Sequence, residues 1–179
     1  MGEIMKLILV KGDISLQKPI CEMLEEWSDY NATHQTNRSP WAIFKKDWKD
    51  FQSYLDNLEI PKETPTRVPS SVFFCFDESR NKMVGAINIR HKLNQQLLLN
   101  GGHIGYGVRP SERGKGIATQ MLALALCECK KLNIPKVLLV CDKTNIASSK
   151  CIQNNGGVLE NEIIVDGKKE MRYWITIEQ

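Results

Sequence analysis

The sequence has no apolar run long enough to cross a membrane, no signal-peptide layout and no long block of basic residues. A transmembrane helix needs about 20 consecutive apolar residues, and no apolar run here approaches that length. The opening residues 1–6 lack the basic and apolar regions of a secretory signal, and the short apolar run 7–10 does not supply them. We therefore expect a cytoplasmic protein with no membrane partner.

Metal-ligand patterns are also missing. No two of the six cysteines form a C-x-x-C pair, and the three histidines are dispersed along the chain. Structural zinc needs clustered Cys and His ligands, so we expect no metal site. Several cysteines lie inside apolar runs, and six reduced, mostly buried thiols are typical of a cytoplasmic protein. The cysteines are Cys21, Cys75, Cys127, Cys129, Cys141 and Cys151.

The charge excess is small. The chain has 24 Lys and Arg against 21 Asp and Glu, a net charge of +3. A nucleic-acid-binding protein is a hypothesis with only this mild excess behind it, so we expect no nucleic-acid partner. With 179 residues, of which 42% are hydrophobic, the chain is long enough to bury a core. We expect one domain that spans residues 1–179.

The first half of the chain favours two helices after a short strand. Residues 5–10 predict the strand, and apolar spacing predicts a helix from Ser15 to about Trp27. The polar segment 29–40 predicts a loop, and a second helix is expected over residues 41–58. An extended connector with three prolines follows.

The second half alternates strands with helices. We expect strands at 71–76, 83–89, 103–108, 136–141, 158–165 and 169–177, helices at 116–132 and 145–154, and a short helical turn within 92–100. The order strand, helix, strand over residues 103–141 predicts a parallel crossover. Asp166-Gly167 predicts a tight two-residue turn between the last two strands.

Two glycines mark a loop between the strand at 103–108 and the following helix. Gly114 and Gly116 have no side chains, so a ligand can approach the backbone closely. The N–H groups of residues 114–119 are unpaired at the helix start and lie at the positive end of its dipole. The pattern predicts a site for a pyrophosphate; the alternative is a flexible loop with no ligand.

Other phosphate motifs do not fit this loop. A P-loop requires Ser or Thr after Gly-Lys, but Gly116 follows Lys115. A dinucleotide fingerprint requires a third glycine where Thr119 stands.

The loop resembles a known family signature. Arg113-Gly-Lys-Gly116-Ile-Ala118 resembles the Arg/Gln-x-x-Gly-x-Gly/Ala signature of the GNAT N-acetyltransferase superfamily. Residues 106–110 resemble the family's fourth strand with its trailing proline, and residues 142–148 resemble its second cofactor segment. The resemblance is strong over residues 102–157.

The resemblance implies a fold. A GNAT protein is of the α/β (α+β) class, with a mixed central sheet of about seven strands, about four flanking helices and a V-shaped gap between the fourth and fifth strands. The runs 88–93 and 101–106 are similar to a bacterial GNAT subgroup. We expect a monomer or a homodimer.

The resemblance also implies acetyl-CoA as cosubstrate. The N–H groups of residues 114–119 would bind its pyrophosphate, and the backbone edge of residues 106–108 would pair with its pantetheine. Asn145 would reach the pantetheine from the other side, although it is also a natural N-cap. The implied cofactor-binding residues are Tyr106, Gly107, Val108, Arg113, Gly114, Lys115, Gly116, Ile117, Ala118, Thr119, Asn145, Ser148 and Lys150. Lys115 or Lys150 would meet the remaining phosphate, although Lys150 also fits an ordinary surface position.

The implied reaction moves an acetyl group from the thioester to a primary amine of a small molecule, peptide or protein, by direct attack in a ternary complex. The backbone N–H of Val108 is the expected donor to the thioester carbonyl. Tyr106 and His103 are the candidates for side chains at the reacting centre, with a packing role open for each. Glu112 and Asp142 are further candidate bases.

The sequence departs from the family at one position. Many members carry a tyrosine, a general acid for the leaving thiol, where this chain has Ile152 beside Cys151. A thiol with a pKa of roughly 8.5 is a tolerable leaving group without a general acid. The departure keeps a second hypothesis open, a non-catalytic acyl-CoA-binding sensor module of the same fold.

The acceptor pocket is expected in the first part of the chain. The first two helices and the loop at 29–40 would form it, with Tyr30, His34 and Trp41 as candidates. Trp27 and Trp48 are expected in the core.

Overall fold

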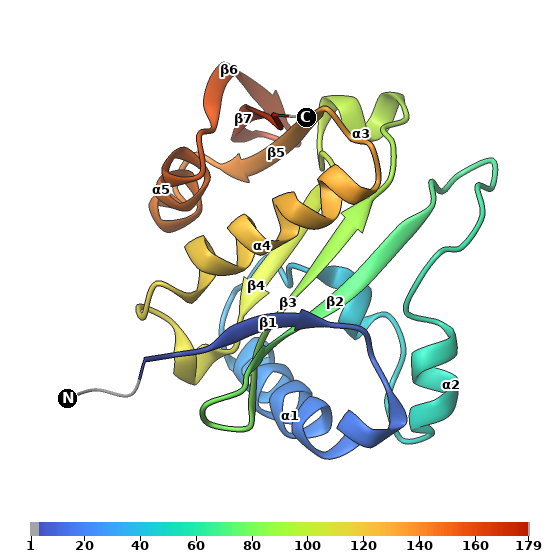
Figure 1. The fold of residues 1–179 in the computed structure, drawn as a ribbon. Coiled ribbons are helices and arrows are strands. Elements are labelled where there is room, and N and C mark those ends of the chain that lie inside the picture. Colours follow the sequence, from blue (N-terminus) through green and yellow to red (C-terminus); the bar gives the residue numbers. More distant parts are fainter. Residues whose placement is uncertain (1–3, 179) are drawn as a thin grey trace.

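The computed structural model describes residues 4–178 and contains seven strands and five α-helices in that range. Figure 1 shows their arrangement, with each element labelled. The strands are β1 (Leu7–Val10), β2 (Ser70–Asp77), β3 (Lys82–Arg90), β4 (Ile104–Val108), β5 (Lys136–Asp142), β6 (Val158–Val165) and β7 (Lys168–Thr176). The helices are α1 (Gln17–Thr33), α2 (Phe51–Asp56), α3 (Gln95–Leu99), α4 (Ile117–Lys131) and α5 (Ile146–Asn154).

The strands form two antiparallel sheets. One has the order β1-β2-β3-β4 and the other β5-β7-β6. β4 and β5 are therefore the edges at which the two sheets meet, and no ladder joins them within the described residues. The expected α/β GNAT-like architecture, with a gap between the fourth and fifth strands, is confirmed, but the parallel pairing expected between these strands is not formed.

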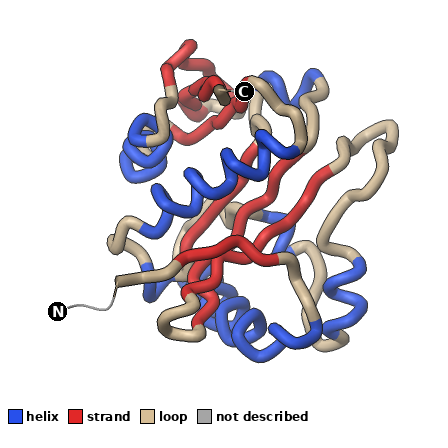
Figure 2. Tube along the Cα trace, in the orientation of Figure 1, coloured by secondary structure: helices blue, strands red, loops and turns tan. Residues whose placement is uncertain are grey.

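Side-chain alternation on β3 explains why helices cover both faces of the first sheet. Ile87 and Ile89 pack with Leu122 of α4, whereas Ala86 packs with Met23 of α1. Alternate residues of a strand point to opposite faces, so one strand serves two hydrophobic layers. Figures 1 and 2 show α4 lying across the four strands.

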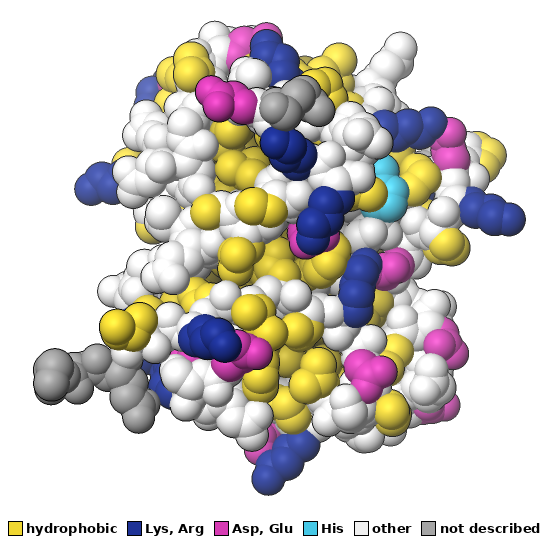
Figure 3. Space-filling view, in the orientation of Figure 1, with side chains coloured by type: hydrophobic (Ala, Val, Ile, Leu, Met, Phe, Trp, Pro, Cys, Tyr) yellow, Lys and Arg dark blue, Asp and Glu magenta, His cyan; other side chains and the backbone are white. Residues whose placement is uncertain are grey.

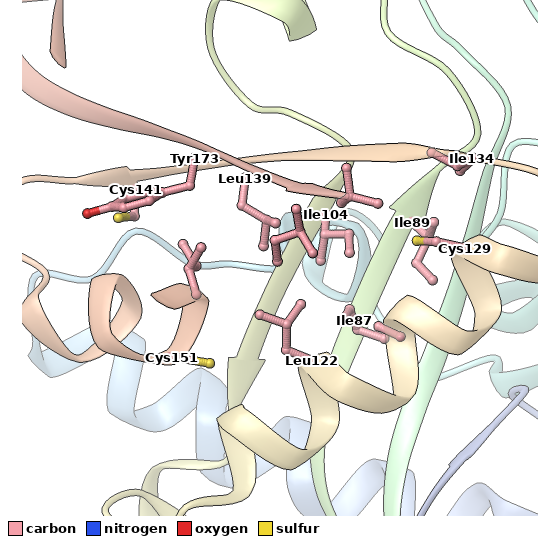
Figure 4. Packing of buried hydrophobic residues seen from close by; sticks show 14 of the residues in the cluster. Ile87, Ile89, Ile104, Leu122, Cys129, Ile134, Leu139, Cys141, Cys151 and Tyr173 are labelled. Carbon is pink, nitrogen blue, oxygen red and sulfur yellow. The ribbon is translucent and has the colours of Figure 1, made fainter. Parts of the chain in front are cut away.

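A third set of contacts joins the two sheets. Leu139 and Cys141 of β5 and Tyr173 of β7 are buried with Ile104 of β4 and Cys151 of α5. Figure 4 shows these side chains converging between the sheets and α4. This packing holds β5 and α5 in place beside β4.

The first half of the chain departs from the predicted helices in two places. α1 continues to Thr33, six residues beyond the predicted end, and the Thr33 hydroxyl donates to the carbonyls of Asp29 and Tyr30. The predicted helix over residues 41–58 is instead a 3-10 turn (Trp41–Phe44), an irregular stretch and α2. The Asp47 carboxylate accepts the backbone N–H of Lys49, a local turn that competes with the helix.

The C-terminal hairpin is formed as predicted. β6 and β7 are joined by Asp166 and Gly167, which have φ values of 49° and 77°. Positive φ at both central residues is the requirement of the turn that matches strand twist.

Membrane spans and cysteines were considered in the sequence analysis, and the structure reports on both. In residues 4–178, no helix combines the length and hydropathy that a membrane span requires. Four of the six cysteines are buried, Cys21 is partly buried and Cys127 is exposed, and all six are free thiols.

Gly102 tests the contact between the sheets. Its φ is +65°, and a Cβ there would overlap the backbone carbonyl of Leu138 on β5. Gly167 has a similar φ of +77° but nothing within 4 Å of its Cβ position. We expect Gly167→Ala to cost about 1 kcal/mol of unfolding free energy, the strain of a left-handed residue. Gly102→Ala should cost about 3 kcal/mol, because overlap with the backbone adds to that strain. Urea unfolding of the two variants measures the difference, and equal losses would contradict the close contact.

Candidate functional site

A cleft of about 1280 Å³ opens where β4 and β5 diverge. One wall comes from β4 and the start of α4, and the other from the end of β5 and the start of α5. Most of the residues expected to bind a cofactor line this cleft. They are Tyr106, Gly107, Val108, Arg113, Gly114, Gly116, Ile117, Ala118, Thr119, Asn145 and Ser148.

The closed end of the cleft is a joint between β4 and β5. The backbone N–H of His103 donates to the Leu138 carbonyl at 2.8 Å, and the His103 Nδ1 accepts the Leu138 N–H at 2.9 Å. The ring is buried and does not line the cleft. Burial and the charge of Arg90 lower the pKa of His103 to about 4. The neutral His103 ring is hydrogen-bonded to the β5 backbone and holds the two strands together. It is badly placed to act as the base at the reacting centre.

The register of β4 leaves its backbone groups facing the cleft. Gly85 of β3 lies opposite Val108, and the Arg109 N–H donates to the Val84 carbonyl. This pattern identifies a non-hydrogen-bonded pair, in which the N–H and C=O of Val108 point away from β3. By the period of two, those of Tyr106 also point outward. The edge predicted to pair with a pantetheine is therefore open.

The phenol of Tyr106 crosses the cleft. Its hydroxyl lies 2.8 Å from the Ser148 Oγ of α5. Burial raises the pKa of Tyr106, and the neighbouring Cys151 raises it further. The phenol therefore stays protonated across the physiological range, as a proton donor and not as a base.

The glycine loop leads directly into α4. Gly116 is the N-cap of the helix in the left-handed conformation, with φ +77°, and the space around its Cβ position and that of Gly114 is empty to 4 Å. The first N–H groups of this 15-residue helix thus border the cleft without side chains in front of them. Such a helix start is suited to bind an anion.

The buried carboxylate of Glu112 anchors the glycine loop. Glu112 is 2% exposed and receives the ammonium groups of Lys82 (2.6 Å) and Lys115 (3.0 Å) and the guanidinium of Arg80 (2.9 Å). Burial alone would raise the pKa of Glu112, but these hydrogen bonds outweigh it and lower the pKa to about 2. Glu112 is therefore an anchor for the loop and a poor base. Lys115, predicted to meet a phosphate, is paired with Glu112 and does not line the cleft.

Helix α1 braces the same loop. Glu26 accepts the Arg109 Nε–H at 2.5 Å and the Ser111 N–H at 2.9 Å. The Arg113 guanidinium lies over the Tyr30 ring, 4.7 Å from its centroid, and the Arg113 Nε donates to the Val108 carbonyl at 3.1 Å. Arg113 thus ties the loop to the edge strand, a role that the signature alone does not reveal.

The α5 wall carries the segment that resembles the second cofactor segment of the GNAT family. The Asn145 Oδ1 caps α5 by accepting the Ser148 N–H at 3.1 Å, while the residue also lines the cleft. Both readings of Asn145 are thus compatible with its position. Asp142 caps the preceding turn through the Thr144 N–H and hydroxyl. Lys150 is exposed and does not line the cleft.

The cleft continues to the other side of β4, below the loop before the 3-10 turn. A Cβ at Gly107 would meet the Trp27 ring at 2.7 Å, so only glycine lets this indole pack on β4. Residues 35–41 line this half of the cleft, including the predicted Trp41, whereas Tyr30 and His34 do not line it. Tyr30 and His34 instead stack on each other, with centroids 3.9 Å apart.

Among the cleft residues that sequence reasoning missed are Asn88 and Arg90, which come from β3. Both lie in a run noted only for its resemblance to a bacterial subgroup. Alternation on β3 places them on the face of Ala86, which packs against α1. That face could have been read from the alternation, but its opening into a cleft depends on distant segments.

Comparison with family models gives a match over residues 16–158 to the acetyltransferase (GNAT) domain. A comparison with curated protein sequences gives no match.

Solved structures with the same fold are available over nearly the whole chain. RimL, a ribosomal L7/L12 α-N-protein acetyltransferase solved with coenzyme A, is 18% identical with a TM-score of 0.66, covering 96% of this chain and 94% of that one. The microcin C7 self-immunity acetyltransferase MccE, with acetyl-CoA and AMP, is 17% identical with a TM-score of 0.64 over 96% and 93%. The Vibrio cholerae spermidine/spermine N-acetyltransferase SpeG is 17% identical with a TM-score of 0.60 over 96% and 95%. At these identities the likeness establishes the fold.

The joint at His103 predicts a pH dependence of stability. Its pKa is about 4 in the folded chain and roughly 6.5 in an unfolded chain. Between these values the unfolded chain binds the extra proton, so stability is complete above about pH 6.5 and falls as the pH drops towards 4. Between pH 7 and pH 5 we expect His103 to account for a loss of about 2 kcal/mol. Urea unfolding at both pH values, compared with His103→Gln, measures this. His34→Gln, a change at an exposed histidine, is the control. An unchanged pH dependence in His103→Gln would contradict the assignment.

Proposed function

The chain belongs to the GNAT acetyltransferase family, and from this premise we propose that it is an acetyl-CoA-dependent N-acetyltransferase. The acceptor is a primary amine of a small molecule, peptide or protein, which attacks the thioester directly while both substrates are bound. The observation that carries the proposal is the open edge of β4 beside the uncovered start of α4.

The residues of the cleft fit acetyl-CoA. The N–H groups of residues 114–119 would bind its pyrophosphate, because the two glycines leave them uncovered. The pantetheine amides would pair, as an added strand does, with the outward N–H and C=O of Tyr106 and with the Val108 carbonyl, which also accepts from Arg113. Asn145 would reach the same arm from α5 through its amide nitrogen, since its oxygen caps the helix.

Acetyl-CoA supplies an acetyl group activated as a thioester. The chain contributes the Val108 N–H, which points to the open edge and would donate to the carbonyl oxygen. In the transfer a C–N bond forms and the C–S bond breaks, while the amine loses a proton and the thiolate gains one. Holding the two reactants together supplies much of the rate.

Tyr106 is the side chain best placed to manage the proton of the leaving thiol. Its hydroxyl stays protonated because burial raises its pKa, and it lines the cleft beside Ser148 and Cys151. It would take the place of the absent tyrosine at position 152, where Ile152 is fully buried in the core.

The second hypothesis, an acyl-CoA-binding module without turnover, has one observation in its favour, which is Ile152. Coenzyme A release measured with a broad panel of amines separates the two. Tight acetyl-CoA binding with no release across the panel would favour the sensor.

The start of α4 can be tested as the binding site of the pyrophosphate. Gly116→Trp places an indole over the start of α4, and we expect it to weaken acetyl-CoA binding at least about 10-fold by calorimetric titration. Gly156→Trp is the matched control, since Gly156 also has a positive φ and open space but lies outside the cleft lining. Unchanged affinity in a folded Gly116→Trp protein means that the pyrophosphate site lies elsewhere.

A separate prediction concerns Tyr106. We expect Tyr106→Phe to lower kcat by about 100-fold or more, the usual range for a proton donor, with little change in the KM for acetyl-CoA. Tyr173→Phe is the matched control, because the Tyr173 hydroxyl contacts Ser149 of α5 at 2.5 Å outside the cleft lining. The same kcat in both variants argues against a proton-donor role.

A further inference from the structure

The acceptor half of the cleft is lined by four basic side chains from separate segments. Arg38 lies in the loop before the 3-10 turn, Lys45 follows that turn, Arg67 belongs to the proline-containing connector and Arg90 ends β3. Within residues 4–178, none of the four has a carboxylate oxygen within 4 Å.

Neutral oxygens are the partners of the two less exposed cations. The Lys45 Nζ donates to the Leu58 carbonyl at 3.0 Å, and the Arg90 guanidinium donates to the carbonyls of Gly101 (3.3 Å) and Gly102 (3.0 Å). Burial lowers the pKa of Lys45, and the charges of Arg67 and Lys46 lower it further. Lys45 and Arg67 thus repel each other, and neither has a neutralising carboxylate beside it.

The acids of the cleft lie elsewhere. Glu112 is neutralised by three basic groups under the glycine loop. Asp142 and Glu170 are cross-strand partners on β5 and β7, on the opposite wall with Lys168. Charge is therefore separated along the cleft, with the unpaired positive charge on the acceptor side.

The floor of the same half holds an unpartnered acceptor. Asn88 is 8% exposed and lines the cleft, and its side-chain Oδ1, which is itself buried, has no hydrogen-bond partner among the described residues. A buried oxygen without a donor costs free energy unless a ligand supplies one. Asn88 lies opposite Gly105 of β4, close to the strand whose edge faces the thioester.

We propose that the acceptor is a small primary amine that carries an anionic group, a carboxylate or a phosphate. The amine lies beside Asn88, whose amide must turn its oxygen towards the cleft to accept an N–H, and the anionic group lies among Arg38, Lys45, Arg67 and Arg90. This inference rests on the proposed acetyl transfer and adds the charge of the substrate to it.

Charge of the opposite sign is disfavoured in the same place. A polycationic amine would bring further positive charge beside unpaired cations, and no carboxylate on this side compensates. On the molecular face in Figure 3, by contrast, Lys and Arg side chains lie singly or beside acidic ones. The unpaired basic cluster is a property of the cleft and not of that general surface.

The test uses pairs of primary amines of which one member carries an anionic group and the other does not. We would measure coenzyme A release with O-phosphoethanolamine against ethanolamine and with β-alanine against β-alaninamide, with spermidine as the polycation. We expect kcat/KM to be at least about 10-fold higher for the anionic member of a pair, and the two pairs separate phosphate from carboxylate recognition. Equal or higher values for the neutral amines or spermidine would overturn the inference.

Three variants distinguish the contribution of the basic side chains from that of Asn88. Arg67→Glu should lower kcat/KM for the anionic amines by about 10-fold or more and leave the neutral ones within about 2-fold. Lys62→Glu makes the same change on the same connector outside the cleft lining and should alter neither. Asn88→Ala should lower kcat/KM for charged and neutral amines alike. If the Arg67→Glu and Lys62→Glu variants have the same kcat/KM for the anionic amine and the same kcat/KM for the neutral amine, recognition of the anionic group by this cluster is refuted.

Binding separates this inference from the proposed function. Calorimetric titration of the coenzyme A-loaded protein with O-phosphoethanolamine and ethanolamine needs no turnover. If no amine is acetylated but O-phosphoethanolamine binds in preference and Arg67→Glu abolishes the preference, acetyl transfer fails and the anionic site stands. If neither the titration nor the turnover distinguishes the two amines, the anionic site fails.

Discussion

Two hydrogen bonds join His103, the residue before β4, to β5. The backbone N–H of His103 donates to Leu138, and its ring accepts from the Leu138 N–H. A protonated ring could not accept that bond, so burial and the low pKa of His103 are part of the same contact. Gly102 allows the backbones to approach, because any side chain there would overlap the Leu138 carbonyl. Beyond this joint the two strands separate and leave the β4 edge open.

The open edge is usable because the loop after it is rigid. Three basic groups converge on Glu112 beneath the loop, and Glu26 of α1 holds Ser111 and Arg109. Breaking a buried ion pair leaves an uncompensated charge, so each of these contacts resists displacement of the loop. Binding a pyrophosphate at α4 then requires little ordering of the protein, which favours affinity. The bulky residues of the signature region thus hold the loop, and its glycines leave the amides uncovered.

Local patterns were enough to predict the elements that form the proposed cofactor half of the cleft. Strand β4, the glycine loop and α4 are consecutive in sequence, and the groups proposed to bind the ligand are mainly backbone amides whose position follows from the elements themselves. The sequence predictions were less accurate where contacts between distant residues determine the local structure. α1 continues through a polar segment because Tyr30 packs under Arg113, which lies far along the chain. Residues 45–50 form no helix because Asp47 makes a local turn, and Lys115 is held by Glu112.

The two halves of the cleft depend on different parts of the sequence. This difference explains why the family resemblance describes the proposed cofactor half and not the acceptor half. The cofactor half depends on backbone geometry over one continuous segment, so a short motif describes it. The acceptor half is built from side chains of the loop at 35–41, the connector, the end of β3 and Lys45, which no single motif covers. Its four basic residues have no recognisable spacing, and each alone reads as an ordinary surface charge. Only the fold shows that they line one space without an acidic partner, and charge complementarity then relates that space to an anionic amine.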